Sequence, residues 1–308
     1  RLEDMTPCIA CLQGCVANMY AGNPICCLTN PFLGHEAEPI AKTENPKKVM
    51  VIGGGVAGLC AAFIAKEKGH EVTLYEAGDV LGGNMRLAAY PPGKGDITNM
   101  IRSYIHRCQK DGVKIVMNCE VTPELIKEEK PDSVIIATGS KTLILPIEGI
   151  DNPAIIHGSD LLDGKRPAGK KVLVVGGGMV GCETAAFLGE QEHDVTVIEF
   201  RDTVGADVIH EHRVYLMKDF EDYGIKEITG AKVCKFYEDG VEYETADGVR
   251  HETRGYDSVI LSMGFRNYNP LEEKIKDLVP ETHVIGDAIR ARRALDATKE
   301  AYEVASRL

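Results

Sequence analysis

The sequence predicts an α/β protein built from two copies of one strand–turn–helix–strand unit, preceded by an irregular cysteine-rich segment. Two segments align without a gap at a constant offset of 123 residues: KKVMVIGGGVAGLCAAFIAKEKGHEVTLYEAGDVLGG (47–83) and KKVLVVGGGMVGCETAAFLGEQEHDVTVIEFRDTVGA (170–206). Internal similarity of this kind marks two copies of one supersecondary unit. In each copy, two apolar strands rich in β-branched residues flank a glycine triplet and a helical stretch. With 308 residues, 44% of them hydrophobic, the chain can build two domain cores.

Each copy has the glycine spacing of a dinucleotide-binding unit. The matching glycines are Gly53, Gly55 and Gly58 in the first copy and Gly176, Gly178 and Gly181 in the second. The first glycine permits the tight turn, the second lets a pyrophosphate approach the backbone, and the third allows close packing of helix and strand. An acidic residue about twenty positions further on, Glu76 or Glu199, can accept hydrogen bonds from the ribose hydroxyls. We therefore predict two Rossmann-like domains that bind two nucleotides and transfer electrons between them.

Two later segments indicate which copy binds a flavin. Each is a buried strand with a characteristic end: DSVIIATGS (132–140) includes Thr138 and Gly139, and THVIGDA (282–288) includes Gly286 and Asp287. A glycine at such a strand end lets the backbone approach a flavin, and the aspartate can accept from ribityl hydroxyls. On spacing alone, Gly286-Asp287 is also compatible with a simple turn.

Here the sequence resembles the flavoproteins with two dinucleotide-binding domains, in which such ATG and GD segments flank an inserted NAD domain. The resemblance implies a discontinuous FAD domain (47–150 and 265–308) and an inserted NAD(P)H domain (151–264). FAD would then contact Gly53, Gly55, Gly58, Glu76, Thr138, Gly139, Gly286 and Asp287, and the nicotinamide nucleotide Gly176, Gly178, Gly181 and Glu199. A carboxylate at the ribose repels a 2′-phosphate, so Glu199 favours NADH over NADPH, although Arg201 could partly offset that repulsion.

Five cysteines crowd into CIACLQGCVANMYAGNPICC (8–27). A disulfide framework is disfavoured in a large α/β protein without secretory features. A thioredoxin-like pair is disfavoured because CIAC does not begin a helix of a βαβ unit. A zinc site is disfavoured because zinc is usually bound by two separated pairs of ligands. Three cysteines within eight residues and a fourth at Cys26 or Cys27 suit a 4Fe-4S cluster.

The order of elements resembles the family of 2,4-dienoyl-CoA reductase, 2-enoate reductase and trimethylamine dehydrogenase. The resemblance implies that the cluster ligands are Cys8, Cys11, Cys15 and Cys27, the last within the closing CLTNP. The segment LGGNMRLAAYPPGK (81–94), which includes Gly83, resembles the family's glycine–glycine turn beside the flavin. Leu12 and Asn84 depart from the family pattern, but neither is a cluster ligand.

The resemblance also implies a larger enzyme. Family members have an FMN-binding TIM barrel ahead of the cluster motif, and this chain begins at Arg1 without an initiator methionine, so we expect it to be the C-terminal, electron-input part. Electrons would pass from NADH to FAD, the 4Fe-4S cluster and FMN in that barrel, where a small-molecule enoate or dienoyl-CoA substrate would be reduced. Because the cofactors carry the redox chemistry, we predict no catalytic acid–base residue in this chain.

Three alternatives remain at this point. An amine-dehydrogenase-like relative would send electrons outward from its substrate and could hold ADP in the FAD-like site. An NADH-dependent electron-transfer subunit could serve a partner protein, as the small subunits of glutamate synthase do, although their cysteine spacing differs. A cluster-based redox sensor would be non-enzymatic, but it would not need two dinucleotide sites.

Composition limits the partners and the location. The net charge of −12 argues against nucleic acid. The longest apolar run, VMVIGGGVAGLCAAFIA (49–65), contains a glycine triplet and is marginal in length for a bilayer, so we expect no membrane span and a cytoplasmic protein. The sequence is compatible with a homo-oligomer. Cys60 and Cys182 lie in the two helical stretches after the glycines, where we predict core positions.

Overall fold

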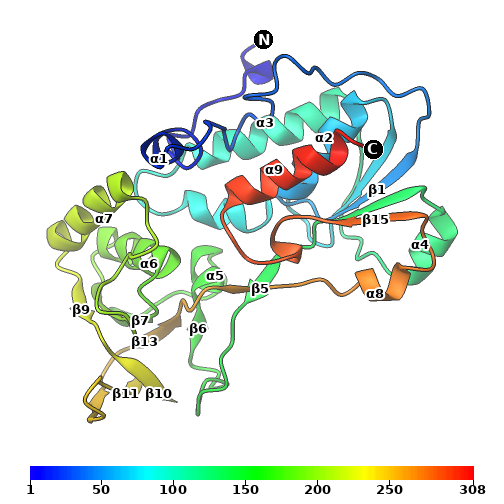
Figure 1. Cartoon of the computed structure of the whole chain (residues 1–308). Coiled ribbons are helices and arrows are strands. Elements are labelled where there is room, and N and C mark those ends of the chain that lie inside the picture. The colour runs from blue at the N-terminus through cyan, green and yellow to red at the C-terminus, as the bar shows by residue number, and fades with distance from the viewer. The chain divides into compact units, whose positions relative to one another are not determined.

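The computed structural model describes residues 1–308 and divides them into two compact units (Figure 1). Unit 1 comprises 1–89, 96–141 and 266–308, and unit 2 comprises 90–95 and 142–265. The sequence-based expectation placed the first boundary after residue 150 instead of residue 141 and did not separate 90–95 from its neighbours. Two short strands, β5 (Ser140–Thr142) and β14 (Phe265–Asn267), pair with each other at the points where the chain passes from one unit to the other.

Unit 1 is built on a five-stranded parallel sheet with the strand order β15-β4-β1-β2-β3. Its strands are β1 (Lys48–Ile52), β2 (Glu71–Tyr75), β3 (Lys114–Val116), β4 (Ser133–Ile136) and β15 (Glu281–Val284). Successive side chains of a strand point to opposite faces, so β1 contributes Val49 and Val51 to one core and Met50 and Ile52 to the other. A strand that is buried on both faces must be apolar at nearly every position, as the sequence VMVI is.

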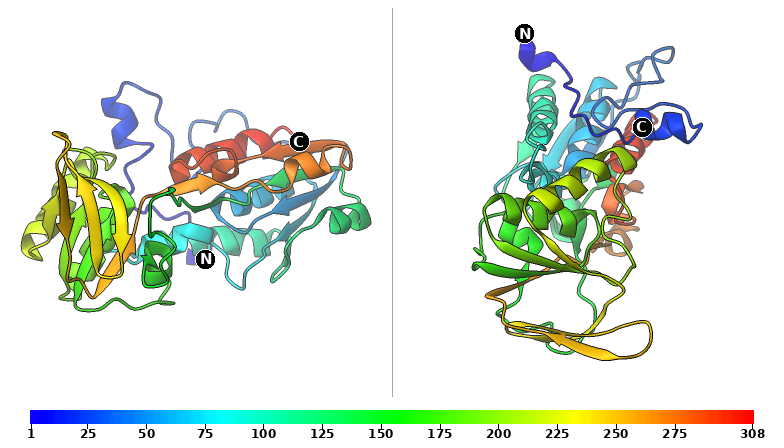
Figure 2. Two further views of the ribbon diagram at one scale, coloured as in Figure 1. Left: turned by 90° about the horizontal axis from the view of Figure 1, so that it is seen from below. Right: turned by 90° about the vertical axis from the view of Figure 1, so that its left-hand side faces the viewer.

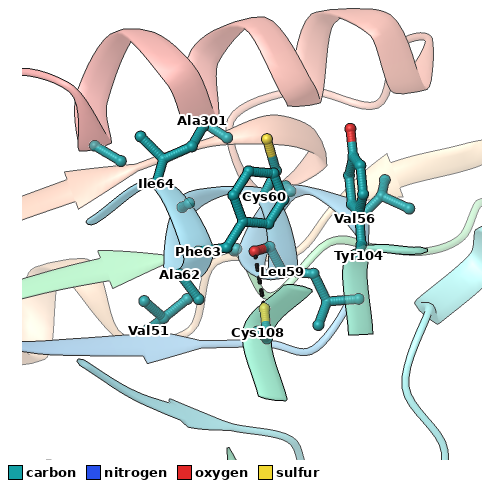
Figure 3. Close-up of a cluster of buried hydrophobic side chains, with 14 of the residues drawn as sticks. Val51, Val56, Leu59, Cys60, Ala62, Phe63, Ile64, Tyr104, Cys108 and Ala301 are labelled. Atoms are coloured by element: carbon teal, nitrogen blue, oxygen red, sulfur yellow. Dashed lines mark hydrogen bonds between the residues drawn. The ribbon is translucent and has the colours of Figure 1, made fainter. Parts of the chain in front are cut away.

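Helices cover both faces of this sheet. One face carries α2 (Val56–Glu67), α3 (Ile97–Lys110) and α9 (Ala294–Ala305), which lie side by side in Figure 1. Helix α2 is buried at every position from Val56 to Ala65, because it lies between the sheet and the other two helices. Figure 3 shows its Leu59, Phe63 and Ile64 within this core. The other face carries α4 (Pro123–Glu129) and α8 (Glu272–Ile275).

Unit 2 repeats this plan with the strand order β6-β13-β7-β8-β9, again all parallel. The strands are β6 (Ile156–His157), β7 (Lys171–Val175), β8 (Asp194–Ile198), β9 (Lys226–Ile228) and β13 (Ser258–Leu261), and the helices are α5 (Gly158–Leu162), α6 (Met179–Glu190) and α7 (His210–Asp222). Val172 and Val174 of β7 pack with α6 and α7, whereas Leu173 and Val175 face an antiparallel sheet. That sheet consists of β10 (Lys232–Tyr237), β11 (Gly240–Glu244) and β12 (Arg250–Thr253), and the right-hand view of Figure 2 shows it opposite the helices.

The predicted α/β class with two Rossmann-like sheets is thus confirmed, as are the core positions of Cys60 and Cys182, both fully buried. Residues 1–46 are largely irregular, as expected. They contain only the short helices η1 (Leu2–Asp4) and α1 (Val16–Tyr20). Two 3₁₀ helices lie elsewhere in unit 1, η2 (Gly83–Ala89) and η3 (Gly286–Ala288). None of the helices combines the length and the apolar character that a membrane span would require.

Candidate functional site: two nucleotide turns and a cysteine segment

The first glycine-rich turn joins β1 to α2 in unit 1. Gly53 adopts φ +110°, and a Cβ there would overlap the carbonyl oxygen of Ala137 just beyond β4. A Cβ on Gly58 would overlap the carbonyl oxygen of Gly53, so α2 packs directly on the turn. A Cβ on Gly55, in contrast, would meet no heavy atom within 4 Å. The turn is therefore closed against the sheet and the helix but open before α2, where a phosphate can approach the helix N-terminus.

Glu76 places a carboxylate beside this turn. It directly follows β2, and its Oε2 accepts a hydrogen bond from the Gly54 N–H at 2.7 Å. Its Oε1 accepts from the Gly78 N–H, also at 2.7 Å. Two backbone donors thus fix the carboxylate at the carboxyl edge of the sheet, which is where the ribose of a dinucleotide binds in this fold.

The second turn, between β7 and α6 in unit 2, repeats these features. Gly176 adopts φ +105°, and a Cβ on Gly181 would overlap the carbonyl oxygen of Gly176. Glu199 directly follows β8, and its two oxygens accept from the N–H groups of Gly177 at 2.5 Å and Arg201 at 2.9 Å. The offset of 123 residues between the two copies therefore matches equivalent positions in three dimensions.

One contact distinguishes the second turn. A Cβ on Gly178 would lie 3.5 Å from Oδ2 of Asp207, and the Met179 N–H at the start of α6 donates to Oδ1 of Asp207 at 2.8 Å. An acidic side chain of the protein therefore lies at the position that is open in the first turn.

Two of the other predicted flavin residues lie against the first turn. Gly83 and Gly286 have φ values of +55° and +63°, which favour glycine. A Cβ on Gly83 would lie 3.1 Å from the Cα of Gly55, and a Cβ on Gly286 would lie 3.1 Å from the Cβ of Ala57. The structure thus brings residues from three separate segments to the start of α2.

The remaining predicted flavin residues follow β4 and β15, whose ends meet because the strands are neighbours in the sheet. The Thr138 hydroxyl donates to the carbonyl of Tyr268 at 2.6 Å, and Gly139 has φ +73° with open space at its Cβ position. The Asp287 carboxylate accepts from the Ser140 hydroxyl and from the Arg292 N–H, each at 3.0 Å. A ligand hydroxyl at Asp287 would share these oxygens with the two protein donors.

The sequence analysis missed an ion pair in unit 2, between Glu183 on α6 and Lys94 from the segment 90–95. The Glu183 side chain is only 9% exposed, and burial raises the pKa of its carboxyl group, while Lys94 and His212 act in the opposite direction. One signal was available in the sequence. The offset of 123 residues aligns Glu183 with Cys60, so a charged residue replaces a core residue in the second copy.

Three other thiols of the cysteine segment lie close enough to Cys11 to affect its pKa. Burial is the main cause that raises the pKa of Cys11, and negative charge on Cys27, Cys15 and Cys8 raises it further. Cys26 accepts a hydrogen bond from the Asn18 amide at 3.4 Å. The choice of Cys27 over Cys26 as the fourth cluster ligand stays a prediction.

The backbone around Cys11 is unusual. Its two neighbours, Ala10 and Leu12, have φ values of +50° and +56°, and the Ala10 N–H donates to the sulfur of Cys8 at 3.4 Å. No group of three or more His, Cys, Asp or Glu side chains is arranged around a point that could hold one metal ion. Four thiolates that bind a 4Fe-4S cube, however, bind four different irons and need not converge on one point.

The end of this segment is fixed to the core of unit 1. Leu28, next to Cys27, is fully buried, and its carbonyl accepts a hydrogen bond from the Tyr104 hydroxyl of α3 at 3.0 Å. The Tyr104 ring packs edge-on against Phe63 of α2, with ring centroids 5.1 Å apart (Figure 3). Two side chains therefore connect the cysteine segment to the helix that begins at the first nucleotide turn.

Comparison with known proteins identifies the family. The family model described as "Pyridine nucleotide-disulphide oxidoreductase" matches residues 47–285, which include both turns. The chain belongs to this family. As a pyridine nucleotide-disulphide oxidoreductase, it is an oxidoreductase with the FAD- and NAD(P)H-binding fold, and the predictions of fold and enzyme class are confirmed.

Relatives of this family member also confirm the resemblance to the enoate reductases. The chain is 32% identical to a "Cinnamate reductase" of Clostridium sporogenes and to a "Metal reductase" of Desulforamulus reducens, over 100% and 98% of its length, respectively. A solved structure of a 2-naphthoyl-CoA reductase complex is also 32% identical, covers 100% of the chain and has a TM-score of 0.95. The chain covers 46%, 50% and 47% of these three proteins, so it spans about half the length of each.

Proposed function

We propose that the chain is the electron-input part of an NADH-dependent enzyme that reduces activated C=C bonds. It would carry electrons from NADH in unit 2 by way of FAD and a 4Fe-4S cluster in unit 1 to FMN in a TIM barrel of the whole protein. The observation that carries this proposal is the repeated turn, present once in each unit with its own ribose-type carboxylate, Glu76 or Glu199. Two such turns provide for two dinucleotides in one chain.

The residues around each turn support the assignment of the two nucleotides. FAD would be held by Gly53, Gly55, Gly58, Glu76, Gly83, Thr138, Gly139, Gly286 and Asp287, all of them in unit 1. Unit 2 would hold NADH through Gly176, Gly178, Gly181 and Glu199. Glu199 favours NADH over NADPH because two backbone N–H groups fix its carboxylate, which would repel a 2′-phosphate.

The cysteine segment fits a 4Fe-4S cluster through its donor set. Cys8, Cys11, Cys15 and Cys27 would supply the four thiolates. Cys8, Cys15 and Cys27 all lie near enough to Cys11 to raise its pKa, and the backbone is left-handed on both sides of Cys11. When bound, NADH supplies a hydride and the flavins and the cluster supply electron transfer, while the protein positions them. The hydrogen bond from Tyr104 to Leu28 and the burial of Leu28 fix the backbone next to Cys27.

The proposed substrate rests on the relatives. A cinnamate reductase and a 2-naphthoyl-CoA reductase match this chain over its whole length, and the match covers about half of each relative. We therefore place the small-molecule substrate and the FMN in the other half of the whole protein, a barrel that is also the chain's partner. The residues of this chain would bind the nucleotides and the cluster and would not contact the C=C bond.

The test compares two acceptors. The chain, loaded with FAD, should oxidise NADH with ferricyanide as acceptor. It should not reduce cinnamate, because the FMN and the substrate site that would bring the C=C bond within hydride-transfer distance belong to the barrel. A Gly181→Val variant is the control: its side chain would overlap the carbonyl oxygen of Gly176 and should abolish NADH oxidation while FAD stays bound. Reduction of cinnamate by this chain alone would refute the proposed division of labour. Failure to oxidise NADH with any acceptor would refute the electron-input role.

A further inference from the structure

The two turns differ in the group that lies before their helices. In the first turn the space at Gly55 is open. In the second turn the Asp207 carboxylate lies 3.5 Å from the Cβ position of Gly178 and accepts a hydrogen bond from the Met179 N–H at 2.8 Å. The N-terminus of a helix attracts an anion through its free N–H groups and its dipole, and in this fold that anion is the pyrophosphate of the dinucleotide. Asp207 thus provides a competing anion from the protein itself.

Comparison of the two copies shows that the carboxylate belongs to the second one only. The offset of 123 residues aligns Asp207 with Asn84, which has no charge. The Asn84 amide donates to the Ser140 hydroxyl at 3.3 Å. The first turn is therefore free of a protein anion at this position.

The loop that carries Asp207 is fixed in place. The Gly205 N–H donates to the carbonyl of Gly177, in the turn itself, at 2.7 Å. The Arg213 guanidinium donates to the Thr203 hydroxyl at 2.8 Å and to the Val204 carbonyl at 3.0 Å. These bonds hold the loop 203–208 against the start of α6, so the contact with Asp207 is a feature of the folded loop.

We propose that Asp207 sets the affinity of the second turn by competing with the pyrophosphate of NADH for the N-terminus of α6. This inference rests on the proposed binding of NADH at the second turn. Because Asp207 is exposed, it can swing into water when the nucleotide arrives. It thereby weakens the binding of NADH and of the product NAD⁺, which favours rapid exchange of the nucleotide at this site. FAD at the first turn meets no such competitor and remains bound.

The test is the affinity for ADP-ribose and for NADH, measured by titration calorimetry on the FAD-loaded chain. Asp207→Asn removes the charge, while its amide oxygen can still accept from Met179. We expect its Kd for both ligands to fall about two- to five-fold, which is the effect of one exposed charge at a helix terminus. The gain should shrink at high salt because exposed charges are screened. Asp202→Asn, at an exposed position directly before this loop, is the matched control and should leave both Kd values unchanged.

The outcomes separate this inference from the proposed function. Binding of ADP-ribose by the wild-type chain, with an equal or higher Kd in Asp207→Asn, would overturn the role of Asp207 alone. An equal gain in Asp202→Asn would show a general charge effect and would also overturn it. If neither the wild-type chain nor the variant binds either ligand while both retain FAD, the assignment of NADH to unit 2 fails, and this inference fails with it.

Discussion

Replacement of Lys94 by methionine should leave a buried carboxylate without its counter-ion. The Glu183 side chain is 9% exposed and the Lys94 side chain 28% exposed, so the pair is largely removed from water. The loss of one partner of a buried ion pair typically costs about 3–5 kcal/mol, because the remaining charge is desolvated and unpaired. Since Lys94 is partly exposed and water can reach the vacated position, we expect a loss of about 2–3 kcal/mol in the free energy of unfolding of unit 2.

A double variant of Lys94 and Glu183 separates the interaction energy of the pair from the effect that each side chain has on its other neighbours. Glu183→Gln removes the buried charge and leaves Lys94 near solvent, so it should cost only about 1 kcal/mol, the value of one hydrogen bond. In Lys94→Met with Glu183→Gln no buried charge remains. The loss should therefore be smaller than the sum of the two single losses, with a coupling of about 1–2 kcal/mol.

The loss in the free energy of unfolding that Lys94→Met causes should also depend on pH. Burial raises the pKa of Glu183 above its ordinary value of 4.5, and Lys94 opposes this shift. A carboxyl group with a raised folded-state pKa contributes stability that is fully present below the unfolded value and is lost as pH rises through the folded value. Without Lys94 the folded pKa rises further, so the deficit should be small near pH 5 and largest near pH 8. Urea unfolding at both pH values measures this difference. Equal losses in unfolding free energy at the two pH values would refute the reasoning, as would a loss in the double variant equal to the sum of the two single losses.

Two further substitutions test the nucleotide and cluster assignments. In Glu199→Ala, the ratio of NADPH to NADH affinity should rise by about ten-fold or more, because the carboxylate that repels a 2′-phosphate is gone. An unchanged ratio would mean that Arg201 or another group controls selection. Anaerobically prepared wild-type chain and Cys26→Ser should contain about four irons, whereas Cys27→Ser should lose the cluster. The reverse pattern, or zinc in place of iron, would contradict the ligand assignment.

The internal repeat made the main architecture predictable. Glycine spacing, β-branched strands and a terminal acidic residue are local features, so they located both turns and both carboxylates, Glu76 and Glu199. The apolar runs rich in β-branched residues, such as VMVI and VLVV, also located the central strands of both sheets. These features depend on the conformations of short segments, which the sequence determines directly.

Features that depend on distant segments were not predictable. Lys94 meets Glu183 across 89 residues, and the segment 90–95 joins unit 2 although both of its neighbours belong to unit 1. Asp207 reaches the start of α6 only because its loop is bonded to Gly177. The position of β15 beside β4 also required the structure, since a parallel neighbour can come from any part of the chain.

Flavin and nucleotide extraction from the purified chain, followed by titration with NADH, tests the central claim most directly. The two-site account predicts about one FAD for each chain, bound in unit 1, and bleaching of that flavin by NADH under anaerobic conditions. Glu199→Ala should raise the NADH concentration needed for half-bleaching without releasing FAD. Extraction of ADP in place of FAD, or a bound flavin that NADH does not bleach, would contradict the account.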